Sequence, residues 1–583
     1  MIIPLHPSIP MFGKAFASFG NSTFRPLSLN PLLAYEAESS MVAPFERPTL
    51  DLDPSNPSSL DIITATRAGV ATYTDADGVI QSADPNTVRV DHVQGEELTP
   101  TKYQRVGYTD FSQGWTEGGV TATNGDGFSG NASKILTGLV AYSSYSLSVS
   151  TFESQNYTAT FYIRRIAGTG MIVARHYFAA SSNDTDITSE VSTEWQRLTV
   201  SFTGKTGGGN VVFGFQMVTA GDQIEIAMPQ VEEGTTATDF VANTTGSPKF
   251  ITGATYGPRV PMILVEPSAT NLLDYSEDFS AFTATNTTVT VNDTESPDGN
   301  ITASKITASS GTVRKSIARF AATTNATEYT VSFYAKAGSH QFVQTYVANN
   351  GSIYANFDLV SGQTQAFGGT TSKMTLAANG FYRCEFTYTG ASGLASAYII
   401  FADSLTHARA GDSSADGYYH IWGAQVEEGP VATSYIPTNG SAVTRNADDL
   451  VIEGSDFTDF YNSSEGTFYI ETQIKEPEKI YAVLRGGSNS QLFIYTNAAT
   501  AHYFYDGGTS TTFGDVTANQ LSRFALSYNS SSVVASLNGS QNTGTSSGNL
   551  ASANKLEIGT QYDVHFNGHI KRLIYWPYHS DDL

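Results

Sequence analysis

The sequence predicts an all-β protein in which tandem antiparallel β-sandwiches follow an extended N-terminal arm. Three observations indicate this class. The 583 residues include 52 glycines and 12% aromatic residues, as in chains with many short strands and tight turns. Apolar and polar residues alternate with a period of two, which is typical of strands with one buried face. Several blocks of sequence also occur twice in the same order, which indicates repeated domains.

The N-terminal part, residues 1–58, contains nine prolines that break any regular element (Pro4, Pro7, Pro10, Pro26, Pro31, Pro44, Pro48, Pro54 and Pro57). Phenylalanine and leucine are still frequent here, whereas a plain linker would be more polar. We therefore expect an attachment arm that packs against another protein. A partly ordered tail is the alternative.

Residues 59–107 are predicted to form a small β-hairpin connector. Asp77 and Gly78 supply a two-residue turn signal between alternating segments. Asp75 and Asp77 are also the candidates for a calcium site, but the twelve-residue loop pattern of such sites is missing. The sequence favours a turn. We expect no cofactor, and a structural calcium ion is the alternative left open.

An internal repeat organises the middle of the chain into 108–245 and 273–440, separated by a connector at 246–272. Five blocks match in order: Tyr108–Trp115 with Tyr275–Phe282, Asn131–Ile135 with Thr302–Ile306, Tyr157–Arg164 with Tyr329–Lys336, Glu194–Phe202 with Gly380–Tyr388, and Gln230–Phe240 with Gln425–Tyr435. Each copy is long enough to bury its own core. The period-two pattern favours antiparallel sheets, and two sheets with jelly-roll connections are the expected architecture.

The C-terminal part, 447–583, is predicted to be a third sandwich. Its expected strands are 466–474, 522–528, 532–537, 556–559 and 569–576. Asn538 and Gly539 mark a hairpin turn after one of them.

Charge and leader patterns exclude several functions. The net charge of −24 repels phosphates, so we expect no nucleic-acid partner. No basic segment with a following apolar run opens the chain, and no apolar stretch is long enough to span a bilayer, so we expect neither a signal peptide nor membrane insertion. The single cysteine, Cys384, lies in a strand-like segment and suits a protein made in a reducing cytosol.

Patterns that would indicate catalysis are missing. The ten histidines are scattered, and no zinc or phosphate-loop motif occurs. The Gly-x-Ser-x-Gly match at Gly544–Gly548 lies in a Ser/Gly-rich loop rather than at a strand–helix turn. The carboxylate pairs Glu232–Glu233 and Glu427–Glu428 are neighbours on a strand and point to opposite faces, so neither forms an acid/base pair. We expect structural roles, with one carboxylate facing inward to order a loop or hold a cation, and no enzyme activity.

Particular blocks of sequence resemble bacteriophage proteins. The segments 425–437 and 271–279 resemble the carbohydrate-binding-module-like jelly rolls of phage tail and fibre proteins, and 263–273 and 65–80 are also typical of such proteins. Relatives usually carry the last two blocks close together, so the first repeat looks like an inserted or duplicated module. The segments 537–539 and 566–577 make the C-terminal unit similar to a concanavalin-like (laminin-G-like) sandwich.

The resemblance implies a virion structural protein, such as a tail fibre, that is made in the host cytoplasm. Its expected partners are other virion proteins, through the arm, and host-surface glycans. Sugar rings stack on aromatic faces, and the candidates are Trp422, Tyr418, Tyr419, Trp115 and Tyr562. Filling of the sandwich core is the alternative role for these side chains, and also for Trp195, Tyr162 and Tyr334.

The functional hypothesis is adhesion to glycans by a homo-oligomer, for which the resemblance implies a trimer. Linked copies would raise avidity by roughly 10²–10⁴ over a single weak site. Two alternatives remain. A capsid-decoration or tail component without a ligand predicts pockets filled by side chains. A polysaccharide-degrading enzyme predicts two inward carboxylates in one cleft.

Overall fold

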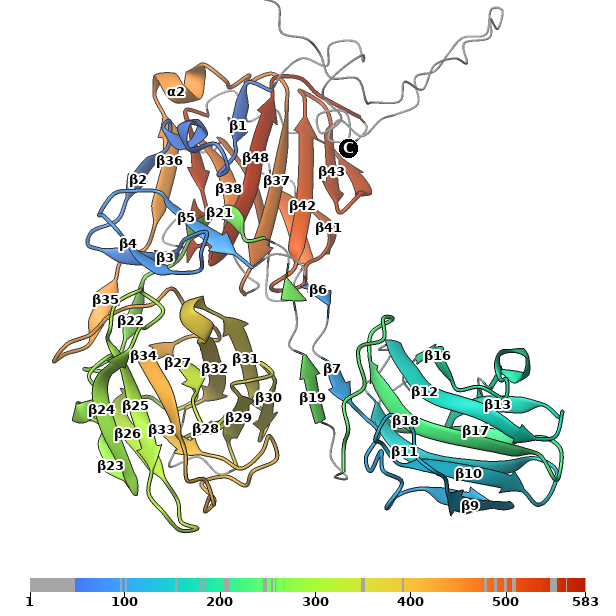
Figure 1. The fold of residues 1–583 in the computed structure, drawn as a ribbon. Helices are drawn as coiled ribbons and strands as arrows, with labels where there is room; N and C mark the ends of the chain where they lie inside the picture. The colour runs from blue at the N-terminus through green and yellow to red at the C-terminus, as the bar shows by residue number, and fades with distance from the viewer. Residues whose placement is uncertain are drawn as a thin grey trace, which may run out of the picture.

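The computed structural model describes residues 48–583 except for short internal segments (95–96, 100–101, 152–155, 179–180, 183, 204–208, 245–248, 253–254, 257, 348–351, 391–392, 477–479, 487–489, 497–500, 506–509, 546–552, 562–563 and 582). Almost all of its regular structure is antiparallel strand, arranged in three sandwiches (Figure 1). The predicted all-β fold of tandem sandwiches is thereby confirmed. Most of the predicted arm lies outside the described residues. Within the described chain, no helix combines the length and apolarity needed to cross a membrane.

The first repeat forms a two-sheet sandwich, which we call module 1 (β8 to β18). One sheet has the order β16-β12-β18-β10-β9 (Gln196–Thr203, Asn156–Ala167, Gln223–Glu233, Ser133–Gly138 and Val120–Asn124). The other has the order β14-β13-β17-β11-β8 (Ser181–Ser182, Ile172–Phe178, Gly209–Met217, Ser143–Thr151 and Thr116–Gly118), and β15 (Thr185–Asp186) also pairs with β13. Buried aliphatic and aromatic side chains from both sheets form its core.

The second repeat forms module 2 (β23 to β34) in the same way. One sheet has the order β23-β26-β33-β28-β29-β30 (Thr283–Thr285, Ser316–Thr323, Gly393–Phe401, Phe342–Tyr346, Tyr354–Asp358 and Thr364–Phe367). The other has the order β24-β25-β34-β27-β32-β31 (Thr287–Thr294, Ala303–Ala308, Tyr418–Glu428, Glu328–Ala337, Tyr382–Thr389 and Thr371–Leu376). Cys384 is fully buried in this core, where burial raises the pKa of its thiol.

The two modules share strand register as well as sequence. In module 1, β12 pairs with β18 so that Thr158 faces Glu232, and a bulge follows Thr160. In module 2, β27 pairs with β34 so that Thr330 faces Glu427, and a bulge follows at the matching place. A one-residue slip would reverse every side chain between core and solvent, so the repeated register preserves the same inward-facing set.

The third unit, which we call the terminal sandwich, takes strands from three distant parts of the chain. Its larger sheet has the order β44-β43-β42-β37-β48-β21-β5 (Ser540–Gly544, Val533–Leu537, Leu521–Tyr528, Gly466–Ile474, Gly568–Trp576, Val260–Val265 and Arg89–Val93), and β1 (Leu50–Leu52) also pairs with β48. Its other sheet has the order β2-β36-β45-β38-β39-β40-β41 (Thr64–Thr66, Asp449–Glu453, Lys555–Ile558, Ile480–Gly486, Ser490–Thr496, Ala501–Tyr505 and Ser510–Asp515).

Strands β1, β2, β5 and β21 come from segments that the sequence assigned to the arm and the two connectors, so these segments are structural parts of the terminal sandwich. The five expected strands of 447–583 correspond to β37, β42, β43, β45 and β48. The boundaries of the predicted domains otherwise stay a prediction.

Short ladders connect the three sandwiches. Module 1 is joined through β6 with β20 (Glu97–Thr99 and Thr255–Tyr256) and β7 with β19 (Lys102–Gln104 and Lys249–Thr252). Module 2 is joined through β22 with β35 (Ala269–Asn271 and Val443–Arg445). Each module is therefore inserted between strands of the terminal sandwich. In Figure 1, module 2 lies next to the terminal sandwich, whereas paired strands hold module 1 apart.

The remaining elements are short. The hairpin β3–β4 (Ala71–Thr74 and Ile80–Ala83) lies between the terminal sandwich and module 2, and β46 pairs with β47 (Thr560–Gln561 and Val564–His565). The described helices are α2 (Ser455–Thr458) and the 3-10 turns η1 to η4 (Pro57–Leu60, Thr188–Glu190, Phe279–Ala281 and Ala378–Gly380).

Candidate functional site

Two of the aromatic residues proposed to stack on sugars are buried, Tyr419 in the core of module 2 and Trp422 in a separate cluster at its junction with the hairpin. Trp422 is 1% exposed, and its indole Nε1 donates a hydrogen bond to Thr302 Oγ1 (3.0 Å). Tyr419 is fully buried, with its ring 4.8 Å from that of Phe401. Neither side chain offers a ring face to a ligand. The role given as the alternative, core filling, is what these two positions have.

Trp422 belongs to an aromatic cluster that closes the junction with the hairpin. Its ring centroid lies 5.4 Å from that of Tyr334 and 4.4 Å from that of Tyr435. Ile80, from the β3–β4 hairpin, packs into the same buried cluster. The main-chain nitrogen of Ile80 also donates to Pro297 O of module 2 (2.9 Å). This cluster therefore fixes module 2 against the hairpin.

The other proposed stacking residues are half-buried or outside the described chain. The Lys305 Nζ atom lies 4.5 Å above the ring of Tyr418. Trp115 in module 1 stacks on Tyr145 at 4.9 Å, and its Nε1 donates to Tyr108 O (3.3 Å). Tyr562 lies outside the described residues. Carbohydrate contact at Tyr418 and Trp115 stays a prediction.

Module 1 carries a further half-buried aromatic group on its five-stranded sheet. Trp195 and Tyr162 both contact Phe128, at 4.8 and 4.6 Å between ring centroids, and Arg164 lies 5.0 Å from the ring of Trp195. Tyr162 matches Tyr334 in the repeat. The corresponding group in module 2 is buried because the hairpin side chain Ile80 packs into it.

The repeated carboxylate pairs have the structural role that the sequence predicted. Glu427 is buried and accepts hydrogen bonds from Thr433 N (3.1 Å) and Thr433 Oγ1 and from Gln425 Nε2. In module 1, Glu232 accepts the same set from Thr238 and Gln230.

The inward glutamate of each pair thus orders the loop after its strand. Burial raises the pKa of Glu427, and its hydrogen bonds oppose this shift only in part. The second glutamates differ between the copies, because Glu233 is buried beside Arg105 whereas Glu428 is exposed.

The calcium candidates Asp75 and Asp77 lie at the turn of the β3–β4 hairpin. Asp75 Oδ1 accepts from Asp77 N (3.0 Å) and Val79 N (2.9 Å), and its Oδ2 accepts from Gln81 Nε2 (2.8 Å). These hydrogen bonds make Asp75 the organiser of the turn. No group of three or more metal-ligating side chains occurs among the described residues.

A buried ion network holds the terminal sandwich, the hairpin segment and module 2 together. Arg89 on β5 is 1% exposed and pairs with Glu266 (2.9 Å) and with Asp448. Asp448 also pairs with Arg67 at 2.8 Å. Glu266 accepts from Ser434 N (2.8 Å) and Ser434 Oγ (2.7 Å), in the loop after β34.

The charge of Glu266 is stabilised from several sides. Burial alone would raise the pKa of this carboxyl, but Lys475 (3.0 Å), Arg445 (3.5 Å) and Arg89 hold it well below its usual value. Glu266 lies in the 263–273 block and Arg67 in the 65–80 block. The two sequence blocks therefore each supply a charged residue to the same buried junction.

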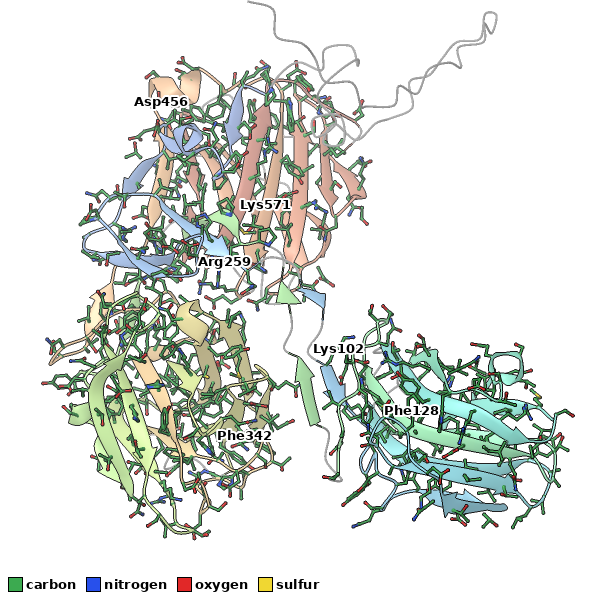
Figure 2. The ribbon with its side chains drawn as sticks, viewed as in Figure 1. Lys102, Phe128, Arg259, Phe342, Asp456 and Lys571 are labelled. Atoms are coloured by element: carbon green, nitrogen blue, oxygen red, sulfur yellow. The ribbon has the colours of Figure 1, made fainter. Side chains whose placement is uncertain are left out.

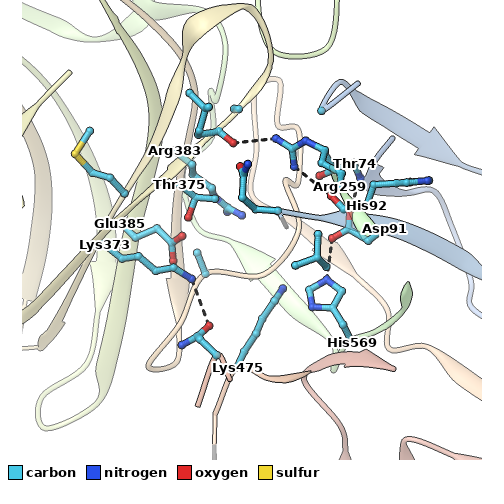
Figure 3. Close-up of a pocket in the computed structure, with 18 of the residues that line it drawn as sticks. Thr74, Asp91, His92, Arg259, Lys373, Thr375, Arg383, Glu385, Lys475 and His569 are labelled. Atoms are coloured by element: carbon cyan, nitrogen blue, oxygen red, sulfur yellow. Dashed lines mark hydrogen bonds and ion pairs between the residues drawn. The ribbon is translucent and has the colours of Figure 1, made fainter. Parts of the chain in front are cut away.

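Beside this network lies a cleft of about 410 Å³ between module 2 and the terminal sandwich. Its module 2 side consists mainly of side chains on β31 and β32, including Lys373, Thr375, Arg383 and Glu385. Figure 3 shows these residues facing Asp91, His569 and Lys475. The remaining polar lining comes from Thr74, His92, Gln94, Arg259, Gln473 and Asn519.

Arg259 bridges the two sides of the cleft. Its Nη1 donates to His92 O on β5 (3.1 Å), and its Nη2 donates to Leu376 O on β31 (3.1 Å). Figure 2 places Arg259 at this junction, well away from module 1. Gly78 makes room for the guanidinium, because a Cβ atom at this position would lie 2.8 Å from Arg259 Nη2.

His569 and Asp91 form a buried pair on the terminal-sandwich side, with 2.8 Å between His569 Nε2 and Asp91 Oδ2. Burial lowers the pKa of His569, and the hydrogen bond to Asp91 offsets this only in part. For Asp91 the balance differs. Burial raises its pKa, but the hydrogen bonds from His569 and Thr74 and the nearby charges bring it below its usual value.

Sequence reasoning missed this cleft because its walls come from many separated segments, between Thr74 and His569. His569 lies inside the strand-like segment 569–576, where the local pattern indicates only a structural role. The strand pairing of β21 with β5 and β48 is what brings Asp91 and His569 together. The alternation on β5 and β32 was detectable, but it does not reveal that these strands face one another across a domain junction.

No known protein family matches the chain, and no curated protein matches it in sequence. Similar solved structures include the CBM22-1 xylan-binding domain of Paenibacillus barcinonensis Xyn10C, at 17% identity over 25% of this chain and 99% of that domain (TM-score 0.18). Domains LG4-5 of the mouse laminin alpha1 chain match at 10% identity over 54% and 89% (TM-score 0.18). Trypanosoma rangeli sialidase matches at 8% identity over 89% and 97% (TM-score 0.20). TM-scores this low do not establish a shared fold or function, so the fold is assigned here from the strand pairing described above.

Proposed function

We propose that this chain is a non-catalytic glycan-binding protein and that the cleft between module 2 and the terminal sandwich is its binding site. The cleft itself is the observation that carries the proposal. Its volume of about 410 Å³ is in the usual range of small-molecule sites. Amide, carboxylate and cationic side chains line it together, and such groups suit a ligand with many hydroxyls.

The proposal extends to adhesion of a bacteriophage to its host. Its support is the resemblance of the 65–80 and 263–273 blocks to phage tail and fibre proteins, together with the junction that these blocks build through Arg67 and Glu266. In this proposal the N-terminal arm attaches the protein to the virion. Several copies, for example in a trimer, would strengthen weak individual sites.

The polysaccharide-degrading alternative concerns the same cleft, because Asp91 and Glu385 both line it. A glycosidase needs a carboxylic acid whose pKa is raised, so that it donates a proton near neutral pH. The pKa of Asp91 is shifted downward, and its carboxylate is engaged by His569 and Thr74. Asp91 is therefore poorly suited to be that acid, which supports binding without hydrolysis.

A purely structural role also has a specific observation in its favour. Tyr419 fills the core of module 2 and Trp422 fills the junction with the hairpin, as expected of a component whose aromatic side chains serve packing. That role predicts that no glycan binds the assembled protein.

The test is a glycan array with the full chain, followed by calorimetry on each ligand found. Thr375→Trp would place a large side chain into the cleft from β31. Thr371→Trp is the matched control, because Thr371 is exposed on the same edge strand and does not line the cleft. Binding that only Thr375→Trp abolishes supports the proposal.

Three results would argue against the proposal. If no glycan binds, the structural role is favoured. If Thr375→Trp binds as well as the unmodified protein, the site is elsewhere. If chromatography finds shorter saccharides after incubation, the protein is an enzyme.

A further inference from the structure

The cleft carries the opposite charge balance to the rest of the protein. The chain has 31 Lys and Arg residues against 55 Asp and Glu residues, for a net charge of −24. The cleft, in contrast, is lined by Arg259, Lys373, Arg383 and Lys475 against only Asp91 and Glu385. A ligand that enters this cleft therefore meets a local excess of positive charge on an otherwise acidic surface.

Some of these charges are already compensated inside the protein. Asp91 is hydrogen-bonded to His569, and Lys475 pairs with Glu266 at 3.0 Å. Three cations of the cleft form no ion pair within the part of the chain that the structure describes: Arg259, Lys373 and Arg383. Together with the carboxylate of Glu385, which lies opposite Lys373 in the strand ladder, these three define the charge that a ligand would meet.

Arg259 is a half-buried cation held in place by neutral groups. Both of its hydrogen-bond acceptors are main-chain carbonyls, one from each side of the cleft. Burial lowers its pKa, which expresses the cost of keeping a guanidinium charge away from water. An anion in the cleft would offset that cost, and the two carbonyl contacts already orient the guanidinium.

Arg383 is similarly restrained. Its Nη2 donates to Ser332 Oγ (3.1 Å), and its guanidinium lies 5.5 Å from the ring of Tyr334. Its buried Nε has no hydrogen-bond partner among the described residues. Lys373, on the neighbouring strand, makes one long hydrogen bond to Asn519 Oδ1 (3.3 Å), which leaves donors of its ammonium group free.

Neutral polar atoms complete the lining. His92 Nδ1 and Gln94 Oε1 are buried without a partner among the described residues, and both side chains line the cleft. Buried polar atoms are normally hydrogen-bonded, so these two positions suit the hydroxyl groups of a bound molecule. The lining thus combines sites for hydroxyls with an excess of cations.

We infer that the cleft takes an acidic saccharide, whose anionic group is held by Arg259, Arg383 and Lys373 while its hydroxyls meet the neutral polar atoms. This inference rests on the proposed function and specifies its ligand class. The anionic group is a uronate carboxylate or a phosphodiester, which share the same charge-assisted recognition by Arg and Lys.

The experiment is calorimetry on the full chain with three probes of similar length. These are a galacturonate trimer, its carboxyl-reduced galactose counterpart and a galactose trimer joined by phosphodiesters. We expect one of the anionic probes to bind about tenfold or more tighter than the neutral one. We also expect its affinity to fall as NaCl is raised, because salt screens charge pairs.

Charge-removing variants test the residues. Lys373→Gln changes an exposed side chain and leaves the core untouched, and Arg383→Gln and Arg259→Gln remove the restrained guanidinium groups. Each should weaken binding of the anionic probe by about tenfold and weaken binding of the neutral probe much less. Arg314→Gln is the matched control, because Arg314 is exposed on module 2 and does not line the cleft. Circular dichroism and thermal unfolding establish that each variant is folded.

The outcomes separate this inference from the proposed function. Equal affinity for neutral and anionic probes, with both lost in Thr375→Trp, overturns the inference and keeps glycan binding at the cleft. Loss of anionic binding in Arg314→Gln as large as in Lys373→Gln also overturns it. If none of the probes binds and the glycan array is blank, the proposed function fails and the inference fails with it.

Discussion

The buried network around Arg89 gives a sharp prediction about stability. Arg89→Met keeps most of the side-chain volume but removes the guanidinium that joins Glu266 and Asp448. It also removes the hydrogen bonds to Thr72 O (2.8 Å) and Ser434 Oγ (2.9 Å). Removal of one partner from a buried ion pair generally costs about 3–5 kcal/mol, because the other charge stays buried.

The structure places the loss at the lower end of this range. Asp448 keeps Arg67 at 2.8 Å, and Glu266 keeps Lys475 at 3.0 Å, so neither carboxylate is left alone. We therefore expect the free energy of unfolding of the terminal sandwich to fall by about 3 kcal/mol. For a unit of this size that corresponds to a decrease of roughly 6–12 °C in Tm.

The assay is differential scanning calorimetry, with urea unfolding followed by tryptophan fluorescence. Arg572→Met is the control, because Arg572 pairs with Asp51 (2.9 Å) in the same sandwich but at a partly exposed position, where such pairs contribute about 1 kcal/mol or less. The transition of module 1 should not move, since its core is separate. A loss for Arg89→Met no larger than that for Arg572→Met would refute the reasoning.

Three further predictions concern the hairpin, the repeated glutamates and acid. Ile80→Ala should destabilise the junction by about 2–5 kcal/mol in thermal unfolding, because Ile80 packs into the Trp422 cluster. Val70→Ala is the control, because Val70 is exposed and its loss should change stability by about 0.5 kcal/mol or less. Similar shifts for both variants would contradict the packing role of Ile80. Glu427→Ala should lower the free energy of unfolding by about 1–3 kcal/mol and speed amide hydrogen exchange at 431–437, because Thr433 and Gln425 lose their acceptor. Glu428→Ala is the control, because Glu428 is exposed. Unchanged exchange in Glu427→Ala would argue against the loop-ordering role. Burial lowers the pKa of His176, His340 and His569 below 6.5 in the folded protein. As the pH decreases from about 7 to 5, these histidines therefore bind protons more readily in the unfolded chain than in the folded protein, and stability should fall. Urea midpoints measure this fall, which should be smaller in His569→Gln. A midpoint that rises as the pH decreases would show that folding raises the pKa of these histidines and does not lower it.

The buried aromatic cluster at the junction shows which part of the site could be predicted from the sequence and which part could not. The sequence identified the aromatic residues of module 2, but it could not decide between ring stacking and core filling. Trp422 lies on β34 and Tyr435 in the loop that follows this strand, and the hairpin residue Ile80 packs into the same cluster. That burial depends on a contact between segments more than 200 residues apart in the sequence, for which local alternation gives no signal.

Local pattern by itself determined the strand content, the repeat and a structural role for the inward glutamates, for which it left loop ordering and cation binding open. Each of these depends on neighbours within a strand or between adjacent strands, where a period of two fixes which side chain is buried. Glu232 and Glu427 therefore contact the threonines that follow six residues later in both copies.

Only the tertiary structure decided how the chain closes on itself. The terminal sandwich is completed by the distant strands β1, β2, β5 and β21. The exposed backbone groups of a strand edge can pair with a strand from any part of the chain, so sequence separation does not prevent this pairing. That closure brings Asp91 to His569 and places β5 opposite β32. The cleft and its excess of cations follow from this long-range pairing, since no single segment of the sequence contains more than a small part of the lining.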